Sequence, residues 1–247
     1  MTETEKEKIQ NKDTKIVLGD AALEIVDAVP FLEGFELALS RYNLTLSPGD
    51  CALIECQTPS MASAFFDFCM GLIPASQGSV KCLGLEWSKL SPIKANALRG
   101  KIGRTFQIGG WLDLLETEAN ILWPNLHHTS LPLDLLIRNA TALAIKFGMP
   151  GLPLLTPNRL SPLDALRSQC IRAFLGYPQV LFFENPISLE HPDFYNSFMD
   201  TLSQARQRGV AVVWSSNNPS IWENTGLERC QRFRLDDDGL LPKKEIF

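Results

Sequence analysis

Residues 51–72 read CALIECQTPSMASAFFDFCMGL and join a strand pattern to a helix pattern. The opening segment, Cys51–Glu55, is a short apolar run that predicts a buried strand. A polar connection separates it from a second apolar run, Phe65–Leu72, which predicts a helix. We therefore expect a strand, a loop over residues 56–64 and a helix.

This loop stands where a nucleotide-binding chain carries its phosphate-binding loop. Such a loop reads G-x-x-x-x-G-K-S/T, because glycines let backbone N–H groups reach the phosphates and a lysine neutralises them. Here the two glycine positions hold Cys56 and Met61, the lysine position holds Ala62, and Ser63 keeps the hydroxyl before Ala64. We expect the strand–loop–helix arrangement without its phosphate-binding chemistry.

Composition limits the class of protein. The 247 residues are 45% hydrophobic and 21% charged, which suits one large α/β domain or two small ones. A net charge of −5 argues against a nucleic-acid partner, since phosphate affinity needs clustered Lys and Arg. We see no signal peptide and no apolar run of membrane-spanning length. Residues 1–14 are polar and charged and predict a disordered lead-in.

The cysteines indicate a reducing environment. None of the six belongs to a C-x-x-C pair, so neither a zinc site nor a secreted disulfide framework is expected. A reducing cytoplasm fits best.

The first part of the chain predicts mostly strands. Ile16–Asp50 alternates apolar and polar residues, as antiparallel strands do, most clearly over Arg41–Leu46. Further strands are predicted at Ser79–Leu83 and at Lys101–Gln107. A polar linker containing Ser91-Pro92 is expected between them.

The remainder predicts helices and then a parallel sheet. Residues 111–172 look mostly helical, with Pro124, Pro132, Pro150, Pro153 and Pro157 as interruptions. The continuous apolar runs Val180–Phe183 and Val210–Trp214 are typical of central parallel strands covered on both faces. Phe194–Arg208 has helical periodicity, which predicts a βαβ crossover between them.

Taken in order, these segments resemble the ATPase subunit of ABC transporters along nearly the whole chain. The similar stretches are GLIPASQGSV at 71–80, IGRTFQ at 102–107 (the Q-loop strand), LSPLD at 160–164 (the LSGGE/Q signature), VLFFENP at 180–186 (the Walker B strand, normally ending D-E-P), SLEHP at 188–192 (the D-loop) and WSSNN at 214–218 (normally ending T-H-D). Each motif is altered, and it is their order and spacing together that are specific.

The resemblance implies an α/β fold of the P-loop NTPase (RecA-like) type. It would combine a parallel sheet core with an antiparallel β subdomain and an inserted α-helical subdomain. On this reading residues 15–107 and 173–247 form the core with its antiparallel β subdomain, and residues 108–172 form the helical subdomain with a degenerate signature.

The helical region carries a narrower resemblance to the MCE (Mla-type) lipid-transport ATPases. The similar stretches are FQIGGW at 106–111, ANI at 119–121, NLHHTSLP at 125–132 and TPNRLS at 156–161. The implied system moves phospholipid or a similar amphiphile between an inner membrane and the periplasm.

The resemblance also assigns roles to residues that differ from the family pattern. Glu184 stands for the aspartate that holds magnesium, Asn185 for the glutamate that orients the attacking water, and Asn217 for a histidine set against the γ-phosphate. An amide cannot accept a proton from water at neutral pH. With the lysine, glutamate and histidine all replaced, we expect a pseudo-ATPase that binds ATP and magnesium only weakly, if at all. No metal site is expected, with Ser63, Gln107 and Glu184 as weak candidates.

Three residues leave alternatives open. Ser63 either offers a hydroxyl to magnesium or caps a helix N-terminus. Gln107 matches the Q-loop, which in the family contacts the membrane subunit, or is a polar residue at a strand end. Ser161 either completes a site in a partner chain, as the signature serine does in ABC dimers, or caps the helix that bears Arg167 and Arg172.

The leading hypothesis is a catalytically degenerate nucleotide-binding subunit of an MCE/Mla-type transporter. It would lie on the cytoplasmic face of an inner membrane as a peripheral protein. The implied partners are a transmembrane permease, an MCE-domain protein reached through the permease, and a second, competent ATPase in preference to a homodimer. One alternative is an ABC-like regulatory or scaffolding protein without transporter attachment. Another is an active enzyme that uses a rebuilt site around Glu184.

Overall fold

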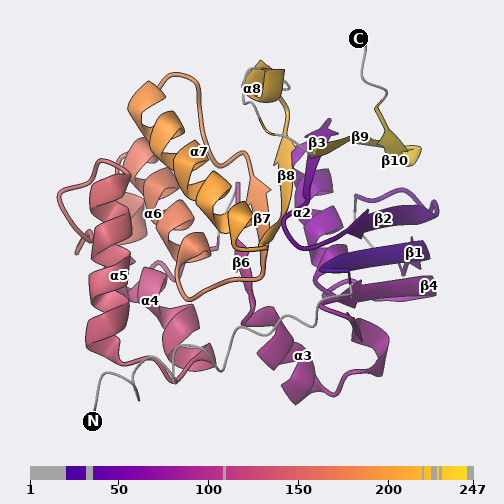
Figure 1. Cartoon of the computed structure of the whole chain (residues 1–247), viewed down its shortest axis with the longest axis horizontal. Coiled ribbons are helices and arrows are strands. Elements are labelled where there is room, and N and C mark those ends of the chain that lie inside the picture. The colour runs from indigo at the N-terminus through magenta and orange to yellow at the C-terminus, as the bar shows by residue number, and fades with distance from the viewer. Residues whose placement is uncertain are drawn as a thin grey trace.

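The computed structural model shows two sheets and a set of helices arranged in layers (Figure 1). It describes residues 21–31, 36–107, 110–218, 220–223, 227 and 230–243. The disordered lead-in expected at residues 1–14 lies outside these described residues.

The smaller sheet is antiparallel, with strand order β2-β1-β4-β5. Its strands are β1 (Leu23–Pro30), β2 (Tyr42–Leu46), β4 (Ala75–Cys82) and β5 (Leu85–Glu86). β1 pairs antiparallel with both β2 and β4, as the alternating pattern predicts.

The larger sheet has the order β10-β9-β3-β8-β7-β6. Its strands are β3 (Cys51–Cys56), β6 (Ile102–Arg104), β7 (Val180–Glu184), β8 (Ala211–Ser216), β9 (Cys230–Asp236) and β10 (Gly239–Pro242). All neighbours pair parallel except β10, which forms an antiparallel hairpin with β9. The predicted central strands and their βαβ crossover are confirmed.

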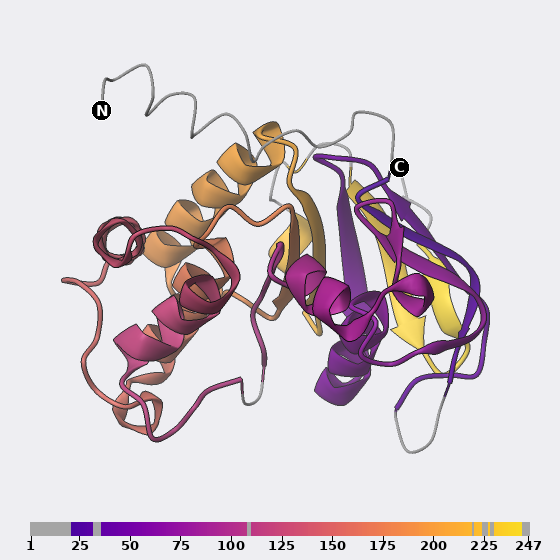
Figure 2. The same ribbon diagram turned by 90° about the horizontal axis from the view of Figure 1, so that it is seen from below.

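The helices cover both faces of this sheet. They are α2 (Pro59–Cys69), α3 (Pro92–Arg99), α4 (Thr117–His128), α5 (Leu133–Lys146), α6 (Pro162–Phe174), α7 (Pro192–Gln207) and α8 (Ser220–Glu223), with short 3₁₀ turns η1 (Trp87–Lys89) and η2 (Pro157–Arg159). Figures 1 and 2 show α4 to α7 on one side of the sheet and the antiparallel sheet on the other.

Alternate residues of each central strand enter two different cores. In β3, Ala52 and Ile54 pack with α2 and the antiparallel sheet, whereas Cys51 and Leu53 pack with the helices of the opposite face. Side chains alternate between the faces of a strand, so a strand covered on both faces is apolar throughout. Helix α2 therefore lies between the two sheets, where it packs against Ala52 and Ile54 of β3.

Three helices begin in the same way, with a Ser or Thr cap followed by proline. Thr58, Ser91 and Ser161 are the N-cap residues of α2, α3 and α6, and each accepts a hydrogen bond from a backbone N–H in the first turn. Proline is well suited to the first helical position because its missing N–H has no helical partner there.

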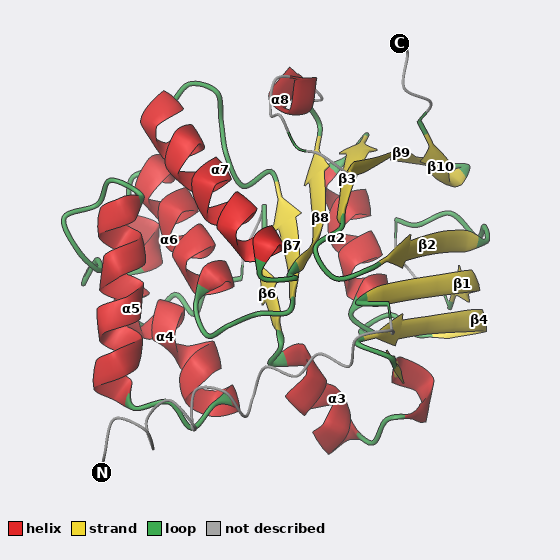
Figure 3. Ribbon diagram, viewed as in Figure 1, coloured by secondary structure: helices red, strands yellow, loops and turns green. Residues whose placement is uncertain are grey.

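These caps correct several sequence predictions. The helix predicted from Phe65 begins at Pro59, so Ser63 lies inside the helix and is not its cap. The expected linker around Ser91-Pro92 is the start of α3. Pro124 lies inside α4 and does not interrupt it. Figure 3 shows helices α4 to α7 gathered on the side of the parallel sheet that faces away from the antiparallel sheet.

Two glycines of the GLIPASQGSV stretch have structural reasons to be glycine. Gly78 has φ +70°, and a Cβ there would lie 2.3 Å from the carbonyl oxygen of Asp27. Gly71 has φ +63°, and a Cβ there would lie 2.4 Å from the Trp87 ring. Backbone in the left-handed region with so little space accepts no side chain without strain.

Among the described residues, no helix has the length and apolar character that crossing a bilayer requires.

Candidate nucleotide site

The segment 56–64, which was expected to be a loop at the phosphate-loop position, is a short connection followed by the start of a helix. β3 ends at Cys56 and α2 begins at Pro59, so only two residues lie between them. The residues at the second glycine, lysine and hydroxyl positions, Met61, Ala62 and Ser63, are on the helix, and so is Ala64.

Backbone donors at the start of α2 are used within the chain. The N–H of Met61 donates to Thr58 Oγ1 at 3.2 Å, and the N–H of Ala62 donates to the Thr58 carbonyl at 3.3 Å. The side chains of Met61 and Ala62 are buried in the core. The N–H groups of Met61 and Ala62 are therefore engaged within the chain, whereas a phosphate-binding loop turns its N–H groups towards the ligand.

A carboxylate lies beside the N-terminus of this helix. Glu36 Oε2 accepts hydrogen bonds from Thr58 Oγ1, at 3.3 Å, and from the Ser60 hydroxyl. The N-terminal end of a helix favours negative charge, which is why phosphates often bind there. In this chain the negative charge comes from Glu36.

The second half of the site is centred on Glu184, the last residue of β7. Its Oε2 accepts hydrogen bonds from Ser63 Oγ at 2.5 Å and from the Gln107 N–H at 3.2 Å. Its Oε1 accepts from the Arg104 guanidinium, from Nε at 2.9 Å and from a terminal nitrogen at 2.7 Å. The Glu184 side chain has no solvent exposure.

Arg104, at the end of β6, holds this cluster together. Its guanidinium also pairs with Asp67 and donates to the Ser63 carbonyl at 3.1 Å. It lies over the rings of Phe66 and Phe106, with centroid distances of 5.7 Å and 4.4 Å. Only 5% of the Arg104 side chain is exposed.

Sequence reasoning missed Arg104 and its second partner, Asp67. Two signals were available: a charged residue inside the predicted strand 101–107, and a lone carboxylate inside an apolar helix. Asp67 lies four residues after Ser63, which places both on one face of α2. The strand–helix contact that joins them to Arg104 depends on the tertiary structure.

The observed contacts do not fit a magnesium ion at Glu184. The Ser63 hydroxyl and Glu184, which would offer oxygen ligands, are bonded to each other, and the remaining carboxylate oxygen is paired with a cation. Across the described part of the chain, no three or more His, Cys, Asp and Glu side chains gather as a metal site requires.

The other predicted site residues form a hydrogen-bonded chain beside this cluster. Asn185 Nδ2 donates to Gln107 Oε1 at 2.7 Å, and Asn185 Oδ1 accepts from the Asn217 N–H at 3.3 Å. Asn185 has φ +42°, a conformation that asparagine tolerates better than most residues. The fold thus brings Gln107, Asn185 and Asn217 together.

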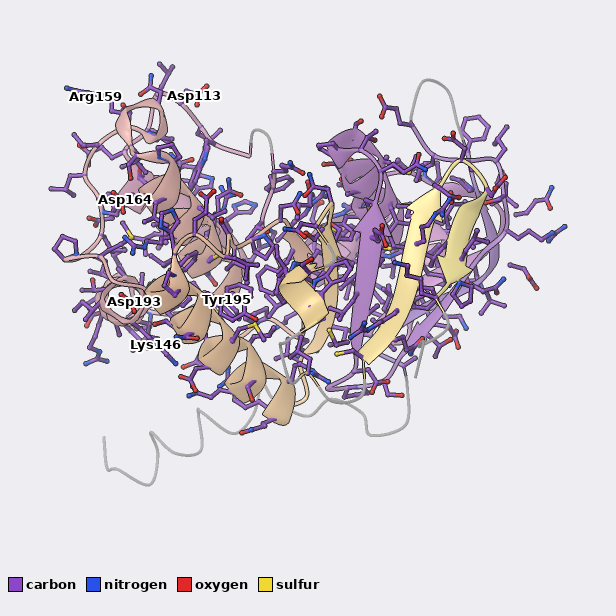
Figure 4. The ribbon with its side chains drawn as sticks, turned by 90° about the horizontal axis from the view of Figure 1, so that it is seen from above. Asp113, Lys146, Arg159, Asp164, Asp193 and Tyr195 are labelled. Carbon is purple, nitrogen blue, oxygen red and sulfur yellow. The ribbon has the colours of Figure 1, made fainter. Side chains whose placement is uncertain are left out.

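Ser161 makes different contacts, at the start of α6. Its hydroxyl donates to Asp164 Oδ2 at 2.8 Å and accepts from the Asp164 N–H at 3.1 Å. Figure 4 places Asp164 on the helical side of the molecule. Of the two interpretations left open for Ser161, the capping role is confirmed, and a role in a partner chain stays a prediction.

Comparison with known sequences identifies relatives of one kind. No family model matches the chain. It is 25% identical over 168 residues to MlaF of Haemophilus influenzae, the ATP-binding protein of an intermembrane phospholipid transport system, covering 68% of this chain and 63% of MlaF. It is 27% identical over 191 residues to PhnC, a phosphonates import ATP-binding protein of Hyphomonas neptunium. This match covers 74% of this chain and 72% of PhnC. MlaF of Escherichia coli K12 is 23% identical over 195 residues, and the match covers 78% of this chain and 72% of that protein.

The chain is a homologue of the ATP-binding subunits of ABC transporters. The match spans less than two thirds of the length of the Haemophilus influenzae MlaF.

Solved structures show that this homologue has the ABC cassette fold. A dimeric bacterial ABC transporter cassette superimposes with a TM-score of 0.75 at 18% identity, covering 88% of this chain and 96% of that one. The same cassette with bound ADP and phosphate superimposes with a TM-score of 0.76 at 16% identity, and the match covers 91% of this chain and 99% of that one. The predicted P-loop NTPase fold is therefore confirmed.

Proposed function

We propose that this cassette is a pseudo-ATPase subunit of an ABC lipid transporter of the MCE/Mla type. The observation that carries the proposal is that side chains of this chain supply the negative charge that a phosphate would bring and the positive charge that a magnesium ion would bring. Glu36 supplies an anion at the start of α2, and Arg104 supplies a cation at Glu184. A nucleotide with magnesium would have to displace both.

Loss of hydrolysis follows from the same residues. Phosphoryl transfer needs charge neutralisation, a metal ion and a positioned water. Ala62 brings no cation to the phosphates, and Asn185 offers an amide that is already bonded to Gln107. ATP and magnesium bind weakly, if at all, and Glu184, Asn185 and Asn217 carry no catalysis.

The remaining role is mechanical coupling to a membrane permease. The relatives named MlaF support a phospholipid system, in which the subunit would be peripheral on the cytoplasmic face of the inner membrane and reach an MCE-domain protein through the permease. A second, competent ATPase supplies the energy, since two copies of this chain would bring no catalytic glutamate.

One surface favours the transporter over a scaffold without membrane partners. Residues after Gln107 expose several large apolar side chains, at Leu112, Leu114, Trp123 and Leu126. Exposed apolar side chains mark a binding surface where they form a contiguous patch. Gln107 matches the Q-loop, which by resemblance contacts the membrane subunit, and these side chains follow Gln107 in the chain.

The test of the pseudo-ATPase is calorimetric titration of the purified chain with Mg-ATP, with Escherichia coli MlaF as the positive control. We expect no binding heat in the micromolar range and no phosphate release. A matched variant, Ala62→Lys/Asn185→Glu/Asn217→His, should still fail to hydrolyse ATP, because Glu36 still lies at the start of α2 and Arg104 still pairs with Glu184. Micromolar affinity in the wild-type chain would refute the proposal.

Coupling is tested separately by tagging the chain in its native host and isolating the assembly in detergent. We expect a permease and a second ATPase to co-purify. Recovery of an assembly that contains only copies of this chain, with ATP turnover, would contradict the hetero-oligomer.

A further inference from the structure

Two cysteines that are far apart in the sequence meet where β3 and β9 begin. Cys51 and Cys230 are directly opposite each other in the parallel pairing of these strands. Both side chains lie on the same side of the sheet, since Cys51 belongs to the core on the helix face and Cys230 packs against that core. Neighbouring strands lie about 4.8 Å apart, which is inside the roughly 4.4–6.8 Å that separates the Cα atoms of disulfides.

The two thiols differ in access. Cys51 is fully buried, whereas Cys230 is partly exposed. Cys230 lines an open groove of about 730 Å³ between the two sheets, together with Thr45 and Lys243. The Cys230 side chain packs against the core on the helix side of the sheet with part of its surface exposed, whereas Cys51 has no exposed surface.

The surroundings of Cys230 favour its thiolate. One Arg206 guanidinium nitrogen lies 3.7 Å from the Cys230 sulfur, while Arg206 Nε is fixed by the Gly49 carbonyl at 2.9 Å. The pKa of Cys230 is lowered, first by the hydrogen bond from Cys51 and then by Arg206 and Arg232, although burial opposes the change. A thiolate is the reactive form of cysteine.

The other four cysteines lack these features. Cys56, Cys69, Cys82 and Cys170 are buried, and burial raises the pKa of each, to about 12 for Cys56 and Cys82. Buried thiols with a raised pKa are inert towards oxidants.

We propose that Cys51 and Cys230 are a redox modification site that hydrogen peroxide converts to a disulfide. The Cys230 thiolate attacks one peroxide oxygen, so that an S–O bond forms, the O–O bond breaks and the leaving hydroxide takes a proton to become water. The Cys51 sulfur then attacks the Cys230 sulfenic acid. An S–S bond forms, the S–O bond breaks, and the hydroxide leaves as water with the Cys51 proton. The sum is two thiols and one peroxide to one disulfide and two waters.

This pair has the arrangement of a sensor, with an accessible cysteine next to a resolving one. The disulfide would join central strand β3 to β9, and with it the β9–β10 hairpin. Since β3 leads directly into α2, the cross-link would act on the same segment as the candidate nucleotide site. The inference itself does not depend on the proposed function, because it concerns thiols outside that site.

The test uses the whole chain, oxidised with hydrogen peroxide under native conditions, with free thiols then blocked by N-ethylmaleimide. Peptide mass spectrometry without reductant should find one Cys51–Cys230 cross-linked peptide and the loss of two of the six thiols. Dithiothreitol should break the cross-link and restore both thiols. This mapping needs no substitution, so it does not depend on any variant folding.

Three variants test the order of events. Cys51→Ser should stop at a Cys230 sulfenic acid that dimedone traps, and Cys230→Ser should leave Cys51 unmodified. Cys170→Ser, which changes a buried thiol bonded to the Pro186 carbonyl, should oxidise like the wild type. First reaction at any other cysteine, or no cross-link in the folded wild type, would overturn the proposal.

Discussion

The guanidinium of Arg104 lies 2.7 Å from the carboxylate of Glu184, at the end of two neighbouring parallel strands. Both side chains are almost completely buried. By resemblance, Glu184 stands where a magnesium-binding aspartate is expected, and Arg104 supplies a positive charge at its carboxylate. This pair links β6 and β7 to α2 through Ser63 and Asp67.

Removing the cation should destabilise the fold strongly. Arg104→Met leaves Glu184 buried without its partner, and we expect a loss of about 3–5 kcal/mol in the free energy of unfolding. Urea denaturation at pH 7 measures it. Arg159→Met, at an exposed position of η2, is the matched control and should change stability by less than about 0.5 kcal/mol.

The double variant Arg104→Met/Glu184→Leu separates charge from packing. Replacing a buried ion pair by apolar side chains often restores stability, so most of the loss should be recovered. If Arg104→Met alone costs under about 1 kcal/mol, the cluster does not depend on this pair.

The left-handed glycine at position 78 gives a second prediction. Gly78→Ala combines φ +70° with a contact of 2.3 Å to the Asp27 carbonyl oxygen. We expect a loss of at least about 1–3 kcal/mol, from backbone strain plus displacement of β1. Gly151→Ala is the control, because a Cβ at Gly151 meets nothing within 4 Å. Equal unfolding midpoints for the two variants would contradict this interpretation.

Ser161 offers a test that separates its cap from a role in a partner chain. Ser161→Ala should cost about 1 kcal/mol by loss of the cap, and Ser161→Thr should keep most of it. ATP turnover of the co-purified assembly, measured well below its melting temperature, reports the second role. Unchanged turnover with alanine would exclude action in trans.

His128 predicts how stability responds to mild acid. Desolvation, with a smaller effect of His127, lowers the pKa of His128 from 6.5. The unfolded chain then binds more protons than the folded one, so stability falls as pH drops through 6.5 towards the folded pKa, and it is constant above that range for this group. The urea midpoint of His128→Asn should fall less between pH 7 and 5.5 than that of the wild type. Parallel curves would show that His128 makes no contribution.

The strands of the parallel sheet were predictable because their sequence signal is local. Val180–Phe183 and Val210–Trp214 are apolar throughout, as a strand buried on both faces requires. Helix starts were predicted less well. Thr58-Pro59 and Ser91-Pro92 were interpreted as loop signals, although Ser or Thr before proline also begins a helix.

The sequence by itself determined which groups are missing from the nucleotide site. Ala62 has no charge and Asn185 has no carboxylate, whatever the fold. The tertiary structure alone decided what takes their place, because Arg104 and Glu184, and likewise Cys51 and Cys230, come from distant parts of the chain. A hydrogen bond or ion pair depends on positions within a few ångströms, and only the packing of strands and helices sets those positions.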